Sequence, residues 1–468
     1  MRLLHELAKI HATFDDRNLV SHAGLVPVMA LAQRAGLGGL AGEHVRIARP
    51  CGVNPHLKVA CLVAGMAAGA DSIDDMDLLR HGALPDLFGG LRAPSTLGSF
   101  LRAFTWGSVL QLLQKVHREF LAELARRAPL LPGAGTLAFV DIDSQQKRVY
   151  GYAKQGAAFG HTKIAGKSLL VRGLNVLAAT ICTPLAAPVI AATRLRGGNA
   201  AAARGAASMI TEAVSTARSA GCTGTLVVRM DSAFYGAPAV QAARKAGARF
   251  SVTVRMDPRV RATIAAIGED AWTAIGYPRA VWDDQLRCWV SDAQVAEVPY
   301  TAFTSRKGQA VTARLIVRRV RDLSKKAVPG QGELFAAWRY HAVFTDSPFV
   351  MLQAEEHHRA HAQAEQVFAD WSDGPLAHLP SGWFPANAAW LALAALTHNL
   401  LRAAGALASH AYARARGATL RRDLIGVAGR TARHGRGHLI LHLPEGWHRA
   451  HEWASLLEAA TGPPSAVA

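Results

Sequence analysis

Cysteines, aromatic residues and acidic residues are scarce in this sequence, and its long apolar runs are interrupted. Five widely spaced Cys in 468 residues, without a CxxC pair, exclude a disulfide framework and a zinc knuckle and favour reduced thiols. Prolines break the two longest uncharged runs, which predicts buried strands over 173–193 and a loop leading into a core helix over 374–401. Glu6 and Asp15 interrupt the N-terminal stretch, which therefore lacks the apolar segment of a secretory signal. We expect a cytoplasmic protein with no membrane partner.

The charge balance is strongly basic. The 52 Lys and Arg outnumber the 34 Asp and Glu, which gives a net charge of +18 and a pI near 10.3. Such a field favours a polyanionic partner, either nucleic acid or an anionic membrane surface. Half of the residues are hydrophobic, which excludes wholesale disorder and leaves ample material for a core. At roughly 150 residues per domain, the length predicts two or three domains.

The pattern of apolar residues divides the chain into five parts. Residues 1–130 show helical periodicity and predict a separate helical N-terminal domain. Residues 131–256 alternate between strands and helices and predict the first part of an α/β core with a mixed sheet. Residues 257–350 predict a β-rich insertion, 351–410 a helical completion of the core, and 411–468 a basic C-terminal region.

Two Asp-Ser pairs follow apolar strand-like segments and lie far apart in the chain. Asp143 ends the segment 137–143, and Asp231, 88 residues later (231 minus 143), ends the segment 225–231. Carboxylates at the ends of adjacent strands can hold a divalent metal ion, because Mg²⁺ prefers oxygen ligands. Asp141 shares a strand face with Asp143, since side chains alternate with a period of two. Asp141 is therefore an alternative first ligand or a partner of that ligand.

A third acid could come from the helical segment 355–370. His358, His361 and Glu365 are spaced i, i+3 and i+7, which places them on one helix face. His357, His361 and Glu365 form an overlapping set that permits a zinc site, although the HExxH pattern of zinc hydrolases is absent. A solvated, charged helix face is the third interpretation.

Basic clusters and a loop supply candidate DNA contacts. Eight Lys or Arg lie between 306 and 326 and eight Arg between 402 and 436, each stretch with one Asp. In so basic a protein we interpret them as phosphate contacts, although each could be a solvated face. The candidates are Arg194, Arg196 and Asn199 in a Gly-containing loop, with Arg314, Arg318, Arg319, Arg421 and Arg422. Trp282, Trp289 and Trp338 could stack on a displaced base or pack in the core.

An ordered series of strings resembles a bacterial insertion-sequence transposase of the DDE superfamily, and is most similar to the family numbered thirteen-eighty. The strings are Asp141-Ile-Asp-Ser, Arg194-Leu-Arg-Gly-Gly-Asn-Ala, Val228-Arg-Met-Asp-Ser-Ala-Phe-Tyr, and the helix bearing Glu365 after Tyr340-His-Ala-Val-Phe-Thr-Asp. Gly69-Ala-Asp-Ser-Ile-Asp-Asp, Pro94-Ser-Thr-Leu-Gly-Ser-Phe-Leu-Arg and Thr397-His-Asn-Leu-Leu-Arg extend the resemblance over nearly the whole chain.

The resemblance implies an RNase H-like catalytic core with two aspartates and a glutamate that hold two Mg²⁺ ions, for which Mn²⁺ substitutes. Asp143, Asp231 and Glu365 occupy the matching positions. Gln145 replaces the Thr of the first motif. Around the third acid, His358, His361 and Ser372 stand where the wider group has Tyr, Arg and Lys, so the phosphate contacts of that Arg and Lys do not carry over.

The function expected from this resemblance is cleavage of double-stranded DNA at inverted terminal repeats and transfer of the ends to a target. Pairing two ends implies a homodimer on DNA, in the bacterial cytoplasm at the nucleoid. Three alternatives remain open: a catalytically inactive DNA-binding derivative, an RNase H-like nuclease or resolvase that does not join strands, and a zinc hydrolase centred on His357 and His361. The terminal repeats, the target preference and the excision route do not follow from the sequence.

Overall fold

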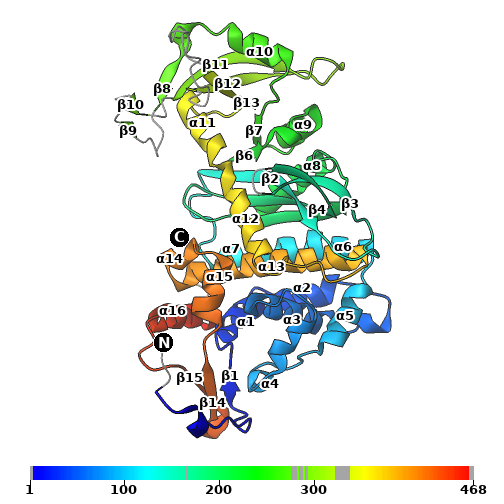
Figure 1. Ribbon diagram of the computed structural model, residues 1–468, viewed down its shortest axis with the longest axis vertical. Helices are drawn as coiled ribbons and strands as arrows, with labels where there is room; N and C mark the ends of the chain where they lie inside the picture. Colours follow the sequence, from blue (N-terminus) through cyan, green and yellow to red (C-terminus); the bar gives the residue numbers. More distant parts are fainter. Residues whose placement is uncertain are drawn as a thin grey trace. The chain divides into compact units, whose positions relative to one another are not determined.

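The chain forms two compact units. The computed structural model describes residues 4–164, 167–275, 282–283, 288–289, 293–321 and 338–462. One unit comprises residues 1–130 and 370–468, and the other comprises residues 131–369 (Figure 1). This division differs from the five parts expected from the sequence. Residues 370–410 do not complete the unit that holds the sheet, and 411–468 do not stand apart, because both segments pack with the N-terminal helices.

The first unit is mainly helical. Its helices and strands are β1 (Leu19–Val20), α1 (Leu25–Arg34), α2 (Leu37–His44), α3 (Pro55–Ala68), α4 (Leu84–Leu87), α5 (Pro94–Arg102), α6 (Trp106–Gln111), α7 (Arg118–Arg127), α13 (Phe384–Ala408), α14 (His410–Ala413), α15 (Gly417–Leu420), β14 (Gly429–Arg433), β15 (Leu439–His442) and α16 (Ala450–Thr461). Short 3-10 or π turns lie at Leu7–Lys9, Pro50–Gly52, Asp74–Arg80, Leu112–His117, Arg421–Ile425 and Gly435–Gly437. Strands β1, β14 and β15 form a small antiparallel sheet.

Helix α13 is the centre of this unit. It packs against α1, α3, α5, α7 and α16. Trp390, in its first half, is fully buried and donates a hydrogen bond to the carbonyl of Pro375. By length and composition α13 could cross a membrane, but 89% of its most apolar window is buried among the other helices. The expectation of a core helix in this region is therefore confirmed.

The second unit is built on one large sheet. Its elements are β2 (Leu137–Arg148), β3 (Ala158–Ile164), β4 (Lys167–Cys182), β5 (Val189–Gly197), α8 (Ala206–Ser219), β6 (Thr225–Met230), α9 (Ala237–Lys245), β7 (Arg249–Thr253), α10 (Pro258–Ala265), β8 (Thr273–Ile275), β9 (Trp282–Asp283), β10 (Cys288–Trp289), β11 (Ala293–Ala302), β12 (Val311–Arg321), β13 (Trp338–Thr345), α11 (Met351–Arg359) and α12 (Gln363–Ser372). Short 3-10 turns lie at Ser232–Phe234, Glu269–Ala271 and Ala360–Ala362.

The sheet mixes parallel and antiparallel pairs, as the sequence predicts. Its order is β3-β4-β2-β6-β7-β13-β12-β11-β8, and β5 also pairs with β4. Strands β2, β6 and β7 run parallel, whereas β4 is antiparallel to β2 and to β5. Strands β3 and β5 meet end to end along β4, where Gly160, Gly173 and Gly198 are required. A Cβ on any of the three would lie 2.1–2.3 Å from a backbone carbonyl oxygen.

The β-rich insertion is part of this same sheet. Strand β13 pairs antiparallel with β7, which extends the sheet through β12 and β11 to β8. The segment 257–350 holds helix α10 and strands β8 to β13. No local pattern predicts that these strands continue the sheet of the preceding segment, because the pairing joins residues far apart in the chain, such as Ser251 and Thr345, 94 positions apart (345 minus 251).

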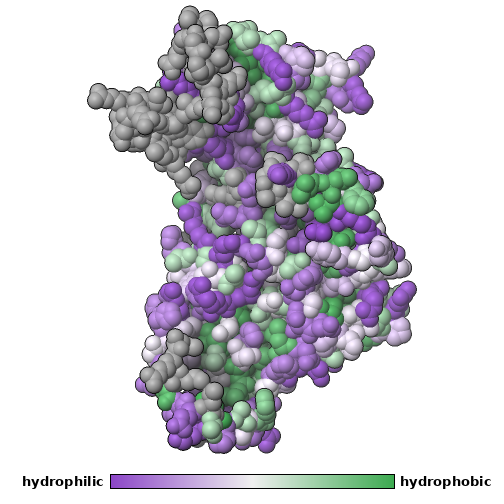
Figure 2. All heavy atoms as spheres, viewed as in Figure 1, coloured by the Kyte–Doolittle hydropathy of each residue, from purple (hydrophilic) through white to green (hydrophobic). Residues whose placement is uncertain are grey.

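Helices cover the two faces of the sheet. Helix α8 packs on β2, β4 and β5. Helix α11 packs on β11 and β12, and its last turn is hydrogen-bonded to β6. In Figure 1, α11 and α12 run as a yellow diagonal along the sheet. The surface in Figure 2 is mostly hydrophilic with scattered hydrophobic patches, consistent with apolar residues gathered between these layers.

Candidate functional site

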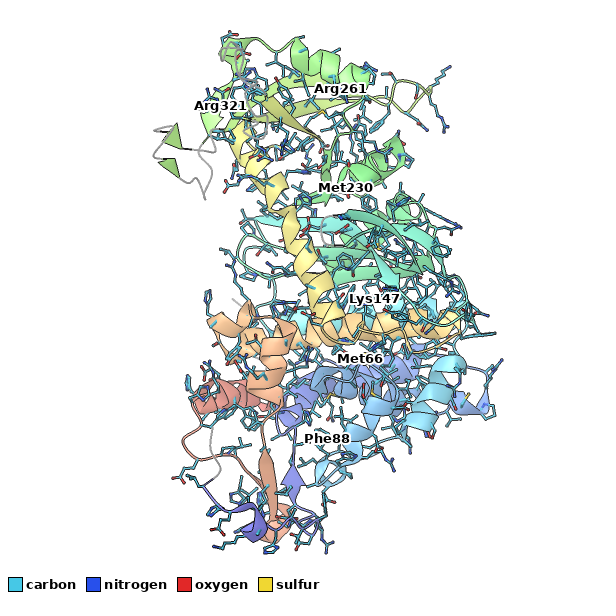
Figure 3. The ribbon with its side chains drawn as sticks, in the orientation of Figure 1. Met66, Phe88, Lys147, Met230, Arg261 and Arg321 are labelled. Atoms are coloured by element: carbon cyan, nitrogen blue, oxygen red, sulfur yellow. The ribbon has the colours of Figure 1, made fainter. Side chains whose placement is uncertain are left out.

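The first two acids of the expected triad lie on neighbouring parallel strands. Asp143 is inside β2, which continues to Arg148, so the expectation that Asp143 ends its strand is wrong. Asp231 directly follows β6, as expected, and accepts a hydrogen bond from the amide of Ala233 at 2.9 Å. Ile142 is paired with Met230, so one residue further along brings Asp143 beside Asp231. Lys147 on β2 and Met230 at the end of β6 mark these strands in Figure 3.

The third acid, Glu365, lies near the start of α12 and is exposed. Burial, and then the negative charges of Asp231, Glu365 and Asp141, raise the pKa of Asp143 to about 7. The amide of Ser144 donates a hydrogen bond to the Asp143 carboxylate at 2.6 Å and opposes this rise. Asp231 and Glu365 therefore both lie within electrostatic reach of Asp143.

Carboxylate oxygens with excess negative charge suit a divalent cation in their donor chemistry. Among the described residues, however, no three His, Cys, Asp or Glu side chains lie close enough to hold one ion as they stand. An ion at this site would have to draw the acids together. The exposed Glu365 side chain has room for such a movement.

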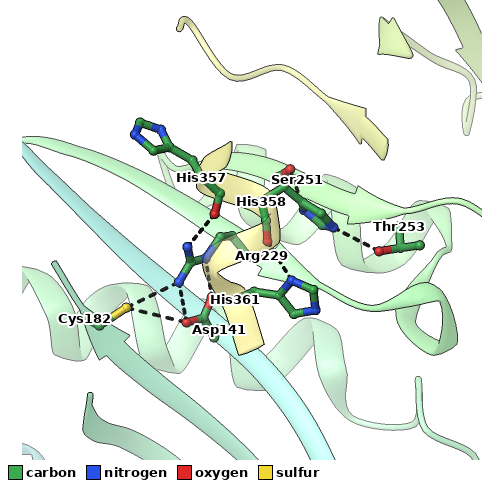
Figure 4. Close-up of polar contacts among 8 residues, drawn as sticks. All are labelled: Asp141, Cys182, Arg229, Ser251, Thr253, His357, His358 and His361. Carbon is green, nitrogen blue, oxygen red and sulfur yellow. Dashed lines mark hydrogen bonds and ion pairs between the residues drawn. The ribbon is translucent and has the colours of Figure 1, made fainter. Parts of the chain in front are cut away.

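Asp141 does not serve as a free ligand. It is 2% exposed and forms an ion pair with Arg229, whose Nε and Nη2 donate to its two oxygens at 2.5 and 2.7 Å (Figure 4). Cys182 lies 3.6 Å from the same carboxylate, which helps raise the pKa of its buried thiol. Of the two aspartates on this strand face, Asp143 is the one left to act on a ligand.

Arg229 is the residue that the sequence interpretation missed. It is 1% exposed, its guanidinium lies 3.9 Å from the centroid of the Phe139 ring, and Nη1 donates to the carbonyl of His357 at 2.6 Å. A signal for it exists in the sequence. Arg229 lies two residues before Asp231, just as Asp141 lies two residues before Asp143. Each of the two apolar segments therefore carries two charged residues on one face, and the first of each could pair across the strands.

His357 and His358 of α11, and His361 in the short turn after it, make structural contacts. His358 is buried between the hydroxyls of Ser251 and Thr253, at 2.8 and 2.9 Å, and burial holds its pKa well below the usual range. His361 bonds through Nδ1 to the carbonyl of His358 at 2.6 Å. The His357 ring packs edge-on against Phe139 and Phe349, and burial lowers its pKa. These contacts give the zinc hypothesis no support.

Two of the expected DNA-binding arginines lie on the wrong face of the sheet. Arg194 and Arg196 are paired through β4 with Ser144 and Gln146, whose side chains point opposite to Asp143. Arg194 forms an ion pair with Glu212 of α8 at 3.0 Å. The expectation that these arginines contact DNA beside the acids is therefore corrected. Asn199, in the turn after β5, is exposed.

Arg196 is a structural residue. It is 7% exposed, and its guanidinium donates to the Asn175 side chain and to the carbonyls of Ala201, Ala202 and Arg204. Burial, followed by two neighbouring arginines, lowers its pKa to about 10. The guanidinium of Arg196 is therefore engaged within the protein.

The remaining expected arginines are also engaged within the protein. Arg314 contacts Glu297, and Arg318 contacts Glu355 at 3.1 Å. Arg319 pairs with Glu269 and lies 4.2 and 4.4 Å from the ring centroids of Trp272 and Trp338. Arg421 donates to the carbonyl of Asp373, and Arg422, 72% exposed, pairs with Asp423. The side chains of Trp282 and Trp289, and Lys325 and Lys326, lie outside the described residues.

Comparisons with known proteins place these observations in a family. Residues 4–461 match the family model described as Transposase DDE domain group 1. Among solved structures, the chain is similar to a cryo-EM structure of the piggyBac transposase synaptic complex with hairpin DNA, at 11% identity and a TM-score of 0.39. That match covers 88% of this chain and 80% of the other. A search of curated proteins found no match.

The proximity of the acids can be tested through the pKa of Asp143. Asp231→Asn and Glu365→Gln should each lower this pKa from about 7 in metal-free protein, because each removes a negative charge that disfavours the ionised carboxylate. Carboxyl ¹³C NMR titration in EDTA measures it. Asp270→Asn, at an exposed position of the insertion, is the control and should change nothing. An unaltered pKa in both test variants would show that the acids are not neighbours.

The structural role of Arg196 predicts a stability defect. Arg196→Met should lower the free energy of unfolding by about 3 kcal/mol, because it leaves several buried carbonyl oxygens without a donor. Urea denaturation measures the change. Arg306→Met, at an exposed turn between β11 and β12, should cost less than about 0.5 kcal/mol. Equal stability of the two variants would return Arg196 to the list of surface cations.

Proposed function

The chain belongs to the transposase DDE domain group 1 family, and on that premise we propose that it is a DNA transposase of a bacterial insertion sequence. It cleaves double-stranded DNA at terminal inverted repeats and joins the ends to a target. The observation that carries this proposal is the placement of Asp143 and Asp231 side by side on neighbouring parallel strands, with the charge of Glu365 acting on Asp143 as well. The narrower assignment to the family numbered thirteen-eighty stays a prediction.

We further propose that the sheet is an RNase H-like core. The order β5-β4-β2-β6-β7, with an antiparallel first half and a parallel second half, supports this assignment. The resemblance implies two aspartates in the core and, after a β-rich insertion, a glutamate from a helix. Asp143, Asp231 and Glu365 occupy these places.

The acids are the proposed holders of two divalent cations, Mg²⁺ or Mn²⁺. Bound there, the cations would activate the attacking oxygen, neutralise charge at phosphorus and stabilise the leaving oxygen. The charges of Asp231 and Glu365 both act on Asp143, which is therefore the proposed ligand shared by the two cations. Arg229 donates to both carboxylate oxygens of Asp141 and does not neutralise Asp143. The Asp143 carboxylate is therefore available to an external cation. Strand transfer at paired ends would require two copies of the chain on DNA.

A second candidate is a transposase-derived DNA-binding protein without catalysis. The separation of the acids among the described residues is the observation that favours it. An RNase H-like nuclease that cuts without joining is the third candidate. A single assay on end-containing DNA, scored separately for binding, cleavage and joining, distinguishes all three.

Loss of any acid should abolish cleavage. Asp143→Ala, Asp231→Ala and Glu365→Ala should each remove detectable Mg²⁺-dependent strand cleavage, because each removes a proposed ligand, while binding to DNA ends remains largely intact. A gel assay with labelled ends and an EDTA control measures both. Asp270→Ala should cleave as the unaltered protein does. A variant of the triad that cleaves at the normal rate would remove its residue from the assignment.

Binding to DNA should depend steeply on salt. With a net charge of +18, the affinity for a terminal duplex should fall about a thousandfold or more between 50 and 200 mM salt, since neutralised phosphates release counterions. Fluorescence anisotropy over a salt series gives the slope. An affinity that hardly changes with salt would contradict DNA as the main polyanionic partner.

A further inference from the structure

Five side chains form a continuous row across five neighbouring strands, on the face of the sheet that carries the acids. The pairing registers place them directly opposite one another from β2 to β12. Directly opposed residues on paired strands share a face. We call this set the anchor row: Asp141, Arg229, Ser251, Thr345 and Arg314.

Helix α11 lies across the strands over this row. Its nine residues span about 14 Å at 1.5 Å per residue. The three strand spacings from β12 to β6 amount to about 14 Å as well. Ala354 of the helix packs with Val295 of β11 and Ile316 of β12, whereas the last turn of the helix reaches Arg229 on β6.

Arginines of the anchor row hold both ends of the helix. Arg314 donates to the carbonyls of Ser347 and Phe349, just before the helix begins, at 2.9 and 2.6 Å. Arg229 donates to the carbonyl of His357 in the last turn, where a cation also suits the negative end of the helix dipole. Ser251 adds a hydrogen bond to the ring of His358 (Figure 4).

The third acid lies a few residues after the end of α11 that Arg229 contacts. Glu365 lies eight residues after His357, and the intervening turn is closed by the bond from His361 to the carbonyl of His358. The same Arg229 that holds His357 is fixed to Asp141, which lies two residues before Asp143 on the same strand face. One guanidinium thus joins the strand of the first acid, the strand of the second acid and the helix that leads to the third.

We propose that the anchor row, and the Asp141–Arg229 pair within it, is a positioning device that sets Glu365 against Asp143 and Asp231. The proposal rests on the proposed function for its catalytic consequence. Asp141 and Arg229 are positioning residues and hold no cation themselves. An apolar pair of similar size could supply equal stability, because a buried ion pair often contributes little net free energy to folding. An apolar pair could not donate a hydrogen bond to the carbonyl of His357. The ion pair therefore adds the placement of α11.

The test separates placement from stability. Asp141→Asn and Arg229→Met should slow Mg²⁺-dependent cleavage about 10- to 100-fold, the usual effect of losing a residue that orients metal ligands. DNA affinity in EDTA should stay within about twofold. Arg229→Lys should give an intermediate rate, because a single ammonium can reach Asp141 or the His357 carbonyl but lacks the planar fork that holds both.

A double variant covers the case in which the single variants fold poorly. Asp141→Leu with Arg229→Met removes both charges together, and should regain much of the stability that either single variant loses while cleavage stays slow. Hydrogen exchange in metal-free protein is the second readout. Backbone amides of residues 351–366 should exchange faster in these variants, with the rest of the sheet unchanged.

The matched control is Arg196→Met, a buried arginine lost from the opposite face of the same sheet. Compared at equal folded fractions, it should cleave within about threefold of the unaltered protein and leave exchange in 351–366 unchanged. The proposal is overturned if the anchor-row variants and Arg196→Met lose activity in the same proportion to stability, or if exchange rises evenly over the sheet. If the unaltered protein does not cleave DNA, the proposed function fails, and the exchange comparison still decides the positioning role.

Discussion

The ion pair between Asp141 and Arg229 is the constraint on which the rest of this unit depends. Both groups are almost fully buried, and an unpaired charge at such a depth would cost several kcal/mol. The pair forms in one register of β2 on β6. A slip by one residue would turn one of the two side chains to the other face of the sheet. Asp143 lies two residues after Asp141 on β2, and Asp231 lies two residues after Arg229 on β6. The register that forms the Asp141–Arg229 ion pair therefore also puts Asp143 and Asp231 side by side.

The same pairing leaves the acids with an unbalanced charge. Arg229 gives its donors to Asp141 and to the carbonyl of His357, so Asp143 has burial and three negative neighbours acting on it. Its raised pKa, about 7, is the measure of that imbalance. A fold selected for stability alone gains nothing from such a cluster. Local electrostatic cost of this kind is typical of sites that receive a ligand of opposite charge.

Local patterns in the sequence predicted much of the fold but few of its contacts. The apolar segments 137–143 and 225–231 fall on β2 and β6, the predicted buried strands over 173–193 fall on β4 and β5, and the strings around Asp143 and Asp231 singled out the right strands. Two kinds of information were missing. The extension of the sheet by β13 depends on pairing between residues far apart in the chain. The packing of α13 depends on which helices surround it, because its surface is apolar on all sides. Neither leaves a periodic signal in the segment itself.

The arginines show most clearly why counting charges along the chain misleads. Arg314, Arg318 and Arg319 are close in sequence, but they meet different partners, and Arg319 points to the opposite face of β12 from the other two. Glu297 lies across the ladder, Glu355 comes from α11 and Glu269 comes from a separate turn, so three apparent DNA contacts are three internal ion pairs. A paired arginine still contributes to the total charge, although its partner cancels its local field. The net charge of +18 therefore attracts a polyanion over a long range. It does not identify the side chains that contact the polyanion.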